Sequence, residues 1–284
     1  YMDAGTFTVQ AGFKGRWREK TYDKQVEFWE NEDLTLADVL GTSTYRLTSI
    51  DPVPSYDGAT DFFNANRDAF ELNEIDSAFD SALEDYRADE DILAGYLLGQ
   101  FATDRLSVIC GVRYENTSNK LYGSTATIYE EGAVLGADCG ADAGAEADDD
   151  IICVAPVEYE RDYDQWLPSL NAKYEITPGL LVRAAGYKSL MRPKLSSLAP
   201  RFEIEVNDEN EIEGTFGNPN LRPYESWNLD ASVEYYMSSN GALSAAVFWK
   251  DIKDYIVDVN IDESGVFNGI AFDEATIPIN GRGA

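Results

Sequence analysis

The sequence predicts an all-β fold, an antiparallel transmembrane β-barrel to which the 284 residues contribute about eight strands. Three observations predict it. Several segments alternate apolar and polar residues with a period of two, which is the spacing of the two faces of a β-strand. Short and long connections follow one another in strict alternation. Aromatic residues gather near the segment ends, on the apolar side.

Residues 6–18 show the alternation most clearly. One face of this segment carries Phe7, Val9, Ala11, Phe13, Gly15 and Trp17. The opposite face carries Thr8, Gln10, Gly12, Lys14, Arg16 and Arg18. The pattern recurs in residues 106–114, 166–174 and 227–235. Each segment is therefore predicted to be a strand with one apolar and one polar face.

The connections between these strands differ sharply in length. Short turns are predicted at residues 102–104, 177–179 and 238–241, and long loops at residues 19–88, 122–158 and 192–226. Outer-membrane barrels combine short periplasmic turns with long extracellular loops in this way. The alternation therefore favours a barrel of the outer-membrane type. The alternative is a soluble antiparallel sandwich with one solvated face.

Side-chain chemistry agrees with the barrel. Aromatic residues stand where its apolar face would meet the two membrane surfaces, at Tyr114, Trp166, Tyr174, Trp227, Tyr235 and Trp249. Charged residues fall on the other face, at Arg113, Lys173, Arg183 and Glu234. A water-filled lumen accepts such charges, whereas a dry core does not.

Two of the long loops show local patterns. A capping box at residues 35–38 predicts a helical turn, and Ile75, Phe79 and Leu83 recur at helical spacing. Residues 132–150 are mostly Ala, Gly, Asp and Glu, and this composition predicts a mobile, solvated loop. The acidic residues nearby would suit Ca²⁺, but their spacing fits no EF-hand and a solvated loop is the simpler interpretation.

Composition excludes several functions. The formal net charge is −30, with 52 acidic and 22 basic residues, which argues against a nucleic-acid partner. The chain has no histidine, so Ser-His-Asp catalysis and histidine-ligated zinc are excluded within it. No paired carboxylates occur at a recognisable catalytic spacing. We therefore expect neither an enzyme nor a bound cofactor.

Three cysteines remain, Cys110, Cys139 and Cys153. Cys139 and Cys153 flank the acidic segment and could form a disulfide in an oxidising compartment, which would leave Cys110 unpaired. Three free thiols are the alternative.

Residues 217–230, GNPNLRPYESWNLD, resemble the GNP-L-P--S-N-D signature of TonB-dependent receptor barrels. Further segments agree with that family in order, at residues 90–96, 111–117, 167–171, 183–185, 191–193 and 248–256. The resemblance covers most of residues 86–256. Each motif is moderately specific, and their joint order and spacing are strong. Their style resembles the Caulobacter and Xanthomonas branch of the family.

The resemblance implies that residues 1–284 are part of one barrel domain of about 22 strands. The family's plug domain, TonB box and aromatic C-terminal strand have no counterpart here. The implied function is TonB-dependent uptake of a carbohydrate or a siderophore across the bacterial outer membrane. The implied partners are outer-membrane lipid and, through a plug outside this chain, the TonB–ExbB–ExbD system. A non-transport surface protein, such as an adhesin or a structural barrel, is the alternative.

In the family, substrate meets the extracellular loops and the upper lumen. The resemblance therefore implies two sets of ligand-binding candidates. Aromatic residues of the first long loop could stack on a sugar or an aromatic siderophore, or could fold the loop onto itself: Trp29, Tyr56, Phe62 and Phe63. Arginines of the third long loop could bind carboxylates, or could pair with nearby acidic residues: Arg192, Arg201 and Arg222.

Overall fold

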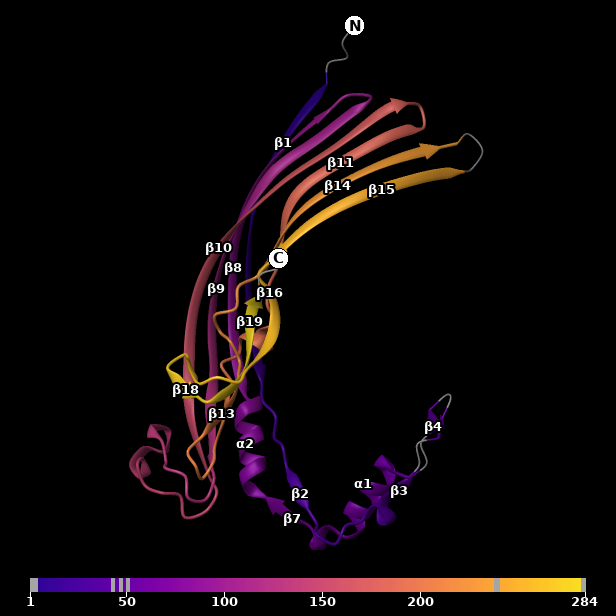
Figure 1. Ribbon diagram of the computed structural model, residues 1–284. Coiled ribbons are helices and arrows are strands. Elements are labelled where there is room, and N and C mark those ends of the chain that lie inside the picture. The colour runs from indigo at the N-terminus through magenta and orange to yellow at the C-terminus, as the bar shows by residue number, and fades with distance from the viewer. Residues whose placement is uncertain (1–4, 42–43, 46–47, 50–51, 238–240, 282–284) are drawn as a thin grey trace.

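A computed structural model describes residues 5–41, 44–45, 48–49, 52–237 and 241–281. One 11-stranded sheet runs through the molecule. Seven long antiparallel strands form its wall, in the order β1 (Thr6–Tyr22), β8 (Tyr86–Ala102), β9 (Leu106–Tyr129), β10 (Ile151–Thr177), β11 (Leu180–Met191), β14 (Tyr224–Tyr236) and β15 (Ala242–Lys253). The wall is curved like part of a cylinder (Figure 1). The predicted all-β partial barrel is confirmed.

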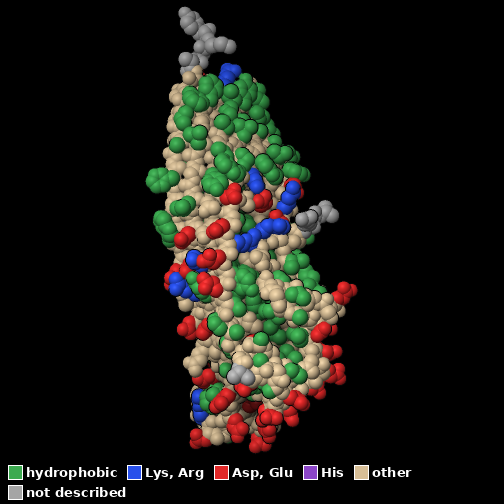
Figure 2. Space-filling view, turned by 90° about the vertical axis from the view of Figure 1, so that its left-hand side faces the viewer, with side chains coloured by type: hydrophobic (Ala, Val, Ile, Leu, Met, Phe, Trp, Pro, Cys, Tyr) green, Lys and Arg blue, Asp and Glu red, His purple; other side chains and the backbone are tan. Residues whose placement is uncertain are grey.

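Strand pairing places the apolar residues on the outer, convex face of this wall. The register aligns Phe7 with Phe101, Phe101 with Val108, and Val108 with Ala172. Leu170 and Trp166 lie on the same face and are more than half exposed. Figure 2 shows hydrophobic side chains over the upper part of this face and acidic side chains over the lower part. The wall thus has an apolar band.

Aromatic residues lie along this band, as the sequence predicts. Tyr114 pairs with Trp166 across β9 and β10, and their ring centroids are 4.9 Å apart. Tyr174 lies eight residues after Trp166 on the same face of β10. Trp249 differs, because it pairs with Leu229 near the middle of β14 rather than near its end.

The short turns and the long loops lie at opposite ends of the wall (Figure 1). The turns predicted at residues 102–104 and 177–179 join paired strands, and β14 pairs with β15 around the predicted turn 238–241, of which residues 238–240 lie outside the described part. We call the other end the loop end.

The second loop is shorter than the predicted 122–158, because β9 continues to Tyr129 and β10 begins at Ile151. Tyr129 pairs with Ile151 and Tyr122 with Glu158, so the hairpin is paired throughout this stretch. The loop was predicted to begin where the alternation of apolar and polar residues ends, but the backbone pairing of β9 with β10 continues beyond that point.

The first loop carries two α-helices, α1 (Tyr56–Ala65) and α2 (Glu74–Glu84). The predicted helical spacing is observed in α2, where Phe79 and Leu83 are buried. The predicted capped turn is η1 (Leu36–Val39). The other short elements of this loop are η2 (Arg67–Ala69), β2 (Phe28–Glu30), β3 (Leu40–Gly41), β4 (Thr44–Tyr45), β5 (Thr48–Ser49), β6 (Val53–Pro54) and β7 (Glu71–Asn73). Among the described residues, no helix is long and apolar enough to cross a membrane.

The loop end also holds a small hydrophobic core. The third loop contributes α3 (Leu195–Leu198), β12 (Phe202–Val206) and β13 (Ile212–Phe216). β12 pairs in parallel with β9 where β8 no longer reaches it, and β13 pairs in parallel with β19 (Glu274–Gly281). The remaining strands are β16 (Tyr255–Ile261), β17 (Gly265–Phe267) and β18 (Ile270–Phe272). Phe202 and Phe216 lie at the centre of this core, with ring centroids 5.7 Å apart.

Ala133, Leu135 and Ala147 of the segment 132–150 are buried in the same core, so the prediction of a solvated loop is only partly right, although residues 142–146 and 148–150 are exposed. The segment forms η3 (Ala137–Asp142) and a β-bridge between Val134 and Glu146. Ala133 and Leu135 are buried, and a disulfide joins Cys139 to Cys153, whose Cα atoms are 5.1 Å apart. Small side chains let the segment pack closely despite its polar composition. Cys110 is a free thiol on the exposed face of β9.

This disulfide should hold the second loop closed. Replacing Cys139 and Cys153 by serine in the full-length protein is expected to lower the free energy of opening the loop by about 2 kcal/mol, because the cross-link limits the open ensemble. Since cleavage follows the open population, a nonspecific protease should cut within residues 130–150 roughly 30-fold faster. Cys110→Ser is the control, and the protease should cleave it at the same rate as the wild type. Equal rates for all three proteins would contradict a structural role for the disulfide.

Candidate functional site

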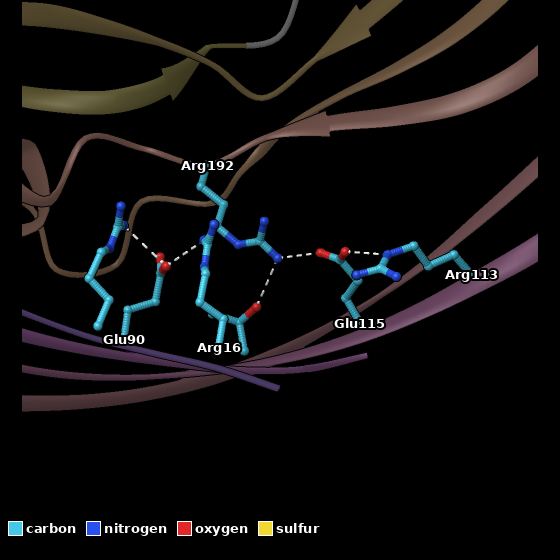
Figure 3. Close-up of polar contacts among 7 residues, drawn as sticks. Arg16, Glu90, Arg113, Glu115 and Arg192 are labelled. Carbon is cyan, nitrogen blue, oxygen red and sulfur yellow. Dashed lines mark hydrogen bonds and ion pairs between the residues drawn. The ribbon is translucent and has the colours of Figure 1, made fainter. Parts of the chain in front are cut away.

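Charged side chains collect on the inner, concave face of the wall. We define the arginine–glutamate network by its six members, Arg16 and Arg18 on β1, Glu90 on β8, Arg113 and Glu115 on β9, and Arg192 just after β11. The five strand residues occupy positions of the polar face, because side chains alternate along each strand. β-sheet register therefore brings together residues that are far apart in the sequence (Figure 3).

Glu90 forms ion pairs with two arginines and accepts a hydrogen bond from Arg16. The Arg16 and Arg18 guanidinium nitrogens lie 2.9 Å and 3.1 Å from the same carboxylate oxygen of Glu90. The Glu90 side chain is 1% exposed, whereas each arginine remains nearly half exposed. Arg16 and Arg18 are two residues apart on one face of β1, so they reach one carboxylate from the same side.

Glu115 is shared in the same way, by Arg113 and Arg192. The Arg113 Nε lies 2.6 Å from one oxygen of Glu115, and an Arg192 guanidinium nitrogen bonds the other oxygen. Arg192 also donates to the Thr117 hydroxyl at 3.2 Å. The chain leaving β11 thus reaches across β10 and attaches to β9. The Arg192 Nε is buried without a hydrogen-bond partner.

The sequence named Arg192 as a candidate but missed its neighbours. Arg16, Arg18 and Arg113 were assigned to the polar face, which was the only available signal. Glu115 lies two residues after Arg113, so the alternation already places these two side chains on one face of the same strand. Nothing in the sequence showed that Glu90 would meet Arg16 and Arg18, or that Arg192 would reach Glu115, because those contacts depend on strand register and on the folded third loop.

The other two candidate arginines lie elsewhere. A guanidinium nitrogen of Arg201 lies 3.5 Å from a carboxylate oxygen of Glu84 in α2. A guanidinium nitrogen of Arg222 lies 2.5 Å from a carboxylate oxygen of Asp254. Each therefore pairs with an acidic residue, the alternative to binding a ligand carboxylate. Arg222 lies within the motif of residues 217–230, and Asn280 of β19 binds both members of its ion pair. The Asn280 side-chain oxygen accepts a hydrogen bond from the Arg222 backbone amide, and the Asn280 side-chain nitrogen donates to the backbone carbonyls of Arg222 and Asp254. These contacts fasten the motif to β19.

The aromatic candidates of the first loop pack mainly against one another. Trp29 meets Phe63 at a centroid distance of 5.9 Å, and the Arg67 guanidinium lies 4.1 Å from the Trp29 ring. Phe62 and Phe63 both contact Phe70. This arrangement folds the loop onto itself. Tyr56 is separate from the cluster and is 86% exposed.

A cavity at the loop end is acidic. Its volume is about 220 Å³ and its lining includes Glu203, Glu205, Glu213 and Glu274. Burial, reinforced by the charges of Glu205 and Asp80, raises the pKa of Glu203 above its usual value. Within the described ranges, no three carboxylate or thiol side chains are arranged to hold a metal ion.

Comparison with solved structures finds partial similarity to bacterial receptors. The ferric-catecholate import receptor Fiu from E. coli K12 is 14% identical, with a TM-score of 0.49, and the match covers 94% of this chain and 30% of Fiu. A mutant of the hemophore receptor HasR from Serratia marcescens is 13% identical, with a TM-score of 0.46, and the match covers 74% of this chain and 32% of HasR. The chain thus matches about a third of the length of each receptor.

Sequence comparison identifies the family. No curated protein matches the chain. The family described as "TonB dependent receptor-like, beta-barrel" matches residues 3–283, nearly the whole sequence. This family match agrees with the resemblance carried by residues 217–230 and with the observed partial barrel. The chain belongs to the TonB-dependent receptor β-barrel family.

Proposed function

We propose that the chain is part of a receptor for TonB-dependent uptake of a nutrient across the bacterial outer membrane. The observation that carries this proposal is the family match over residues 3–283. The two faces of the wall support it. The apolar outer band suits contact with lipid, and the charged inner face suits a water-filled lumen through which a polar solute passes.

In the proposed receptor, the loop end faces the outside of the cell and the short turns face the periplasm. The nutrient is a carbohydrate or a siderophore. The exposed Tyr56 and the cluster of Trp29, Phe62 and Phe63 are candidates to meet it first, and Arg192, Arg201 and Arg222 are candidates further along. A plug domain outside this chain links the barrel to TonB–ExbB–ExbD. The proposed role is transport and not catalysis.

The test is uptake in cells that carry or lack the gene for the full-length protein. A panel of labelled ferric siderophores and oligosaccharides is supplied at low concentration to wild-type, deletion and complemented strains, and to a strain without TonB. We expect the deletion to abolish uptake of one solute class, complementation to restore it, and loss of TonB to abolish it equally. Uptake that is unchanged by the deletion, together with a loss of surface attachment, would favour the adhesin or structural barrel instead.

A further inference from the structure

The arginine–glutamate network carries more positive charge than its own ion pairs use. Its four guanidiniums share two carboxylates. Lys14 lies on the same face of β1 as Arg16 and adds a fifth cation. Among the described residues, no carboxylate lies within ion-pairing distance of the Lys14 ammonium. These seven residues therefore hold an excess of three positive charges.

That excess is unexpected in this chain. The sequence has 52 acidic residues against 22 basic ones, so acidic partners for a purely structural network are plentiful. Two of these cations, Arg113 and Arg192, have side chains that are only 32% and 18% exposed, and they share a single carboxylate, that of Glu115. Cations shielded from water in this way are costly unless their charge is balanced. The unbalanced charge points to a negatively charged group that is not part of the described chain.

The cations surround a small cavity. Its volume is about 110 Å³, and it is lined by Lys14, Arg16, Ile92, Arg113, Glu115 and Arg192. That space admits a carboxylate or a phosphate group. Guanidinium groups offer several N–H donors in one plane, which suits the oxygens of such groups.

We propose that Lys14, Arg16, Arg113 and Arg192 form an oxyanion site on the inner wall, which binds the carboxylate or phosphate group of a solute. This inference rests on the proposed transport function, because it names the chemical class of solute that the lumen takes. The carboxylate of Glu115 orients Arg113 and Arg192 from one side and leaves the cavity net positive.

The test measures equilibrium binding of small probes to the full-length protein, purified in detergent at 0.15 M salt. The probes are inorganic phosphate, glucuronate and glucose; the last two differ by a carboxylate. The variant is Lys14→Gln, which breaks no ion pair within the described chain and should therefore assemble normally. The matched control is Lys173→Gln, another lysine on the polar face, which lines a different cavity.

We expect Lys14→Gln to weaken the binding of phosphate or glucuronate about tenfold or more, the usual worth of a hydrogen bond to a charged group. Lys173→Gln should bind as the wild type does. Arg113→Gln is a second test variant and should also weaken binding, because it removes one of the cations that line the cavity. This variant should still fold, because Glu115 keeps Arg192 as a partner. Binding of phosphate itself would show that a free oxyanion suffices, whereas binding of glucuronate alone would show that the anion must be carried on a larger solute.

Three results would overturn the site: no binding of either anion, binding of glucose that is as tight as that of the anions, or binding of the anions that is unaffected by both Lys14→Gln and Arg113→Gln. The assay needs no TonB and no energised membrane. A failure of the oxyanion site therefore leaves TonB-dependent uptake in cells unchanged. A failure of the transport proposal would appear in the uptake assay, whatever the binding measurement shows.

Discussion

Replacing Leu170 by arginine is expected to destabilise the full-length protein in a bilayer by about 2–4 kcal/mol, the cost of an arginine at the lipid-facing midplane of a barrel. Leu170 lies on the outer face of β10, four residues from Trp166 and four from Tyr174. If those two aromatic residues mark the two membrane surfaces, Leu170 lies at the middle of the hydrocarbon layer. Its side chain is 51% exposed, so a charge introduced there would face the lipid.

The control is the neighbouring residue. Asn171 points to the inner face, where Lys173 and Arg183 already lie, so Asn171→Arg should be tolerated. The measurement is the urea midpoint of the protein in vesicles, together with its yield in the outer-membrane fraction. A large loss for Leu170→Arg with little loss for Asn171→Arg supports the assigned faces. The reverse order would mean that the two faces are exchanged.

The long strands could be predicted from the sequence because one residue determines the face of the next. Once Phe7 is apolar and Thr8 polar, the period of two assigns every position as far as Arg18, without knowledge of any distant residue. The turn at residues 177–179 carries its own local signal in Pro178 and Gly179, and Gly179 has the positive φ that such a turn requires. Strands and short turns are local properties.

The loop end could not be predicted in this way. β12 joins the wall in parallel with β9, and no short-range pattern in residues 202–206 selects that partner. The segment 132–150 was assigned to solvent from its composition, yet it buries Ala133 and Leu135 against a core built by Phe202 and Phe216. Both features depend on surfaces that exist only after the third loop has folded onto the wall.

The arginine–glutamate network could be predicted from the sequence only in part. The polar face of β1 could be read directly, so its cations were known to face the lumen side of the wall. Their partners depend on register: Glu90 meets Arg16 and Arg18 because Arg18 pairs with Glu90 across the sheet. A shift by one residue would turn Glu90 to the lipid side. The sequence therefore predicted that these cations face the lumen side, but it did not predict which carboxylates pair with them.

Replacing Glu115 by glutamine is expected to cost about 3 kcal/mol of stability, the lower end of the range for removing one partner of a buried ion pair. The change preserves the shape of the side chain but leaves Arg113 and Arg192 without a counter-charge. The Glu115 and Arg192 side chains are 11% and 18% exposed, so water compensates them poorly. Arg113 is about a third exposed, which moderates the loss. Urea unfolding of the full-length protein in vesicles measures it.

The matched control is Glu160→Gln on the outer face of the neighbouring strand. Glu160 pairs with Lys120 at 2.5 Å, but both side chains are more than half exposed, so this change should cost less than about 1 kcal/mol. Combining Glu115→Gln with Arg192→Gln should recover part of the loss, because it removes one of the stranded charges. Equal midpoints for Glu115→Gln and Glu160→Gln would mean that the network is fully solvated.

The same variant separates the two roles of the network. Among the described residues, Glu115 supplies the one carboxylate in the lining of the 110 Å³ cavity, so Glu115→Gln should raise the affinity of this cavity for phosphate while it lowers the stability of the barrel. A network that only ties the third loop to β9 has no reason to bind phosphate more tightly when it is weakened. Opposite changes in stability and affinity therefore require both a structural ion pair and an oxyanion site, built from the same arginines.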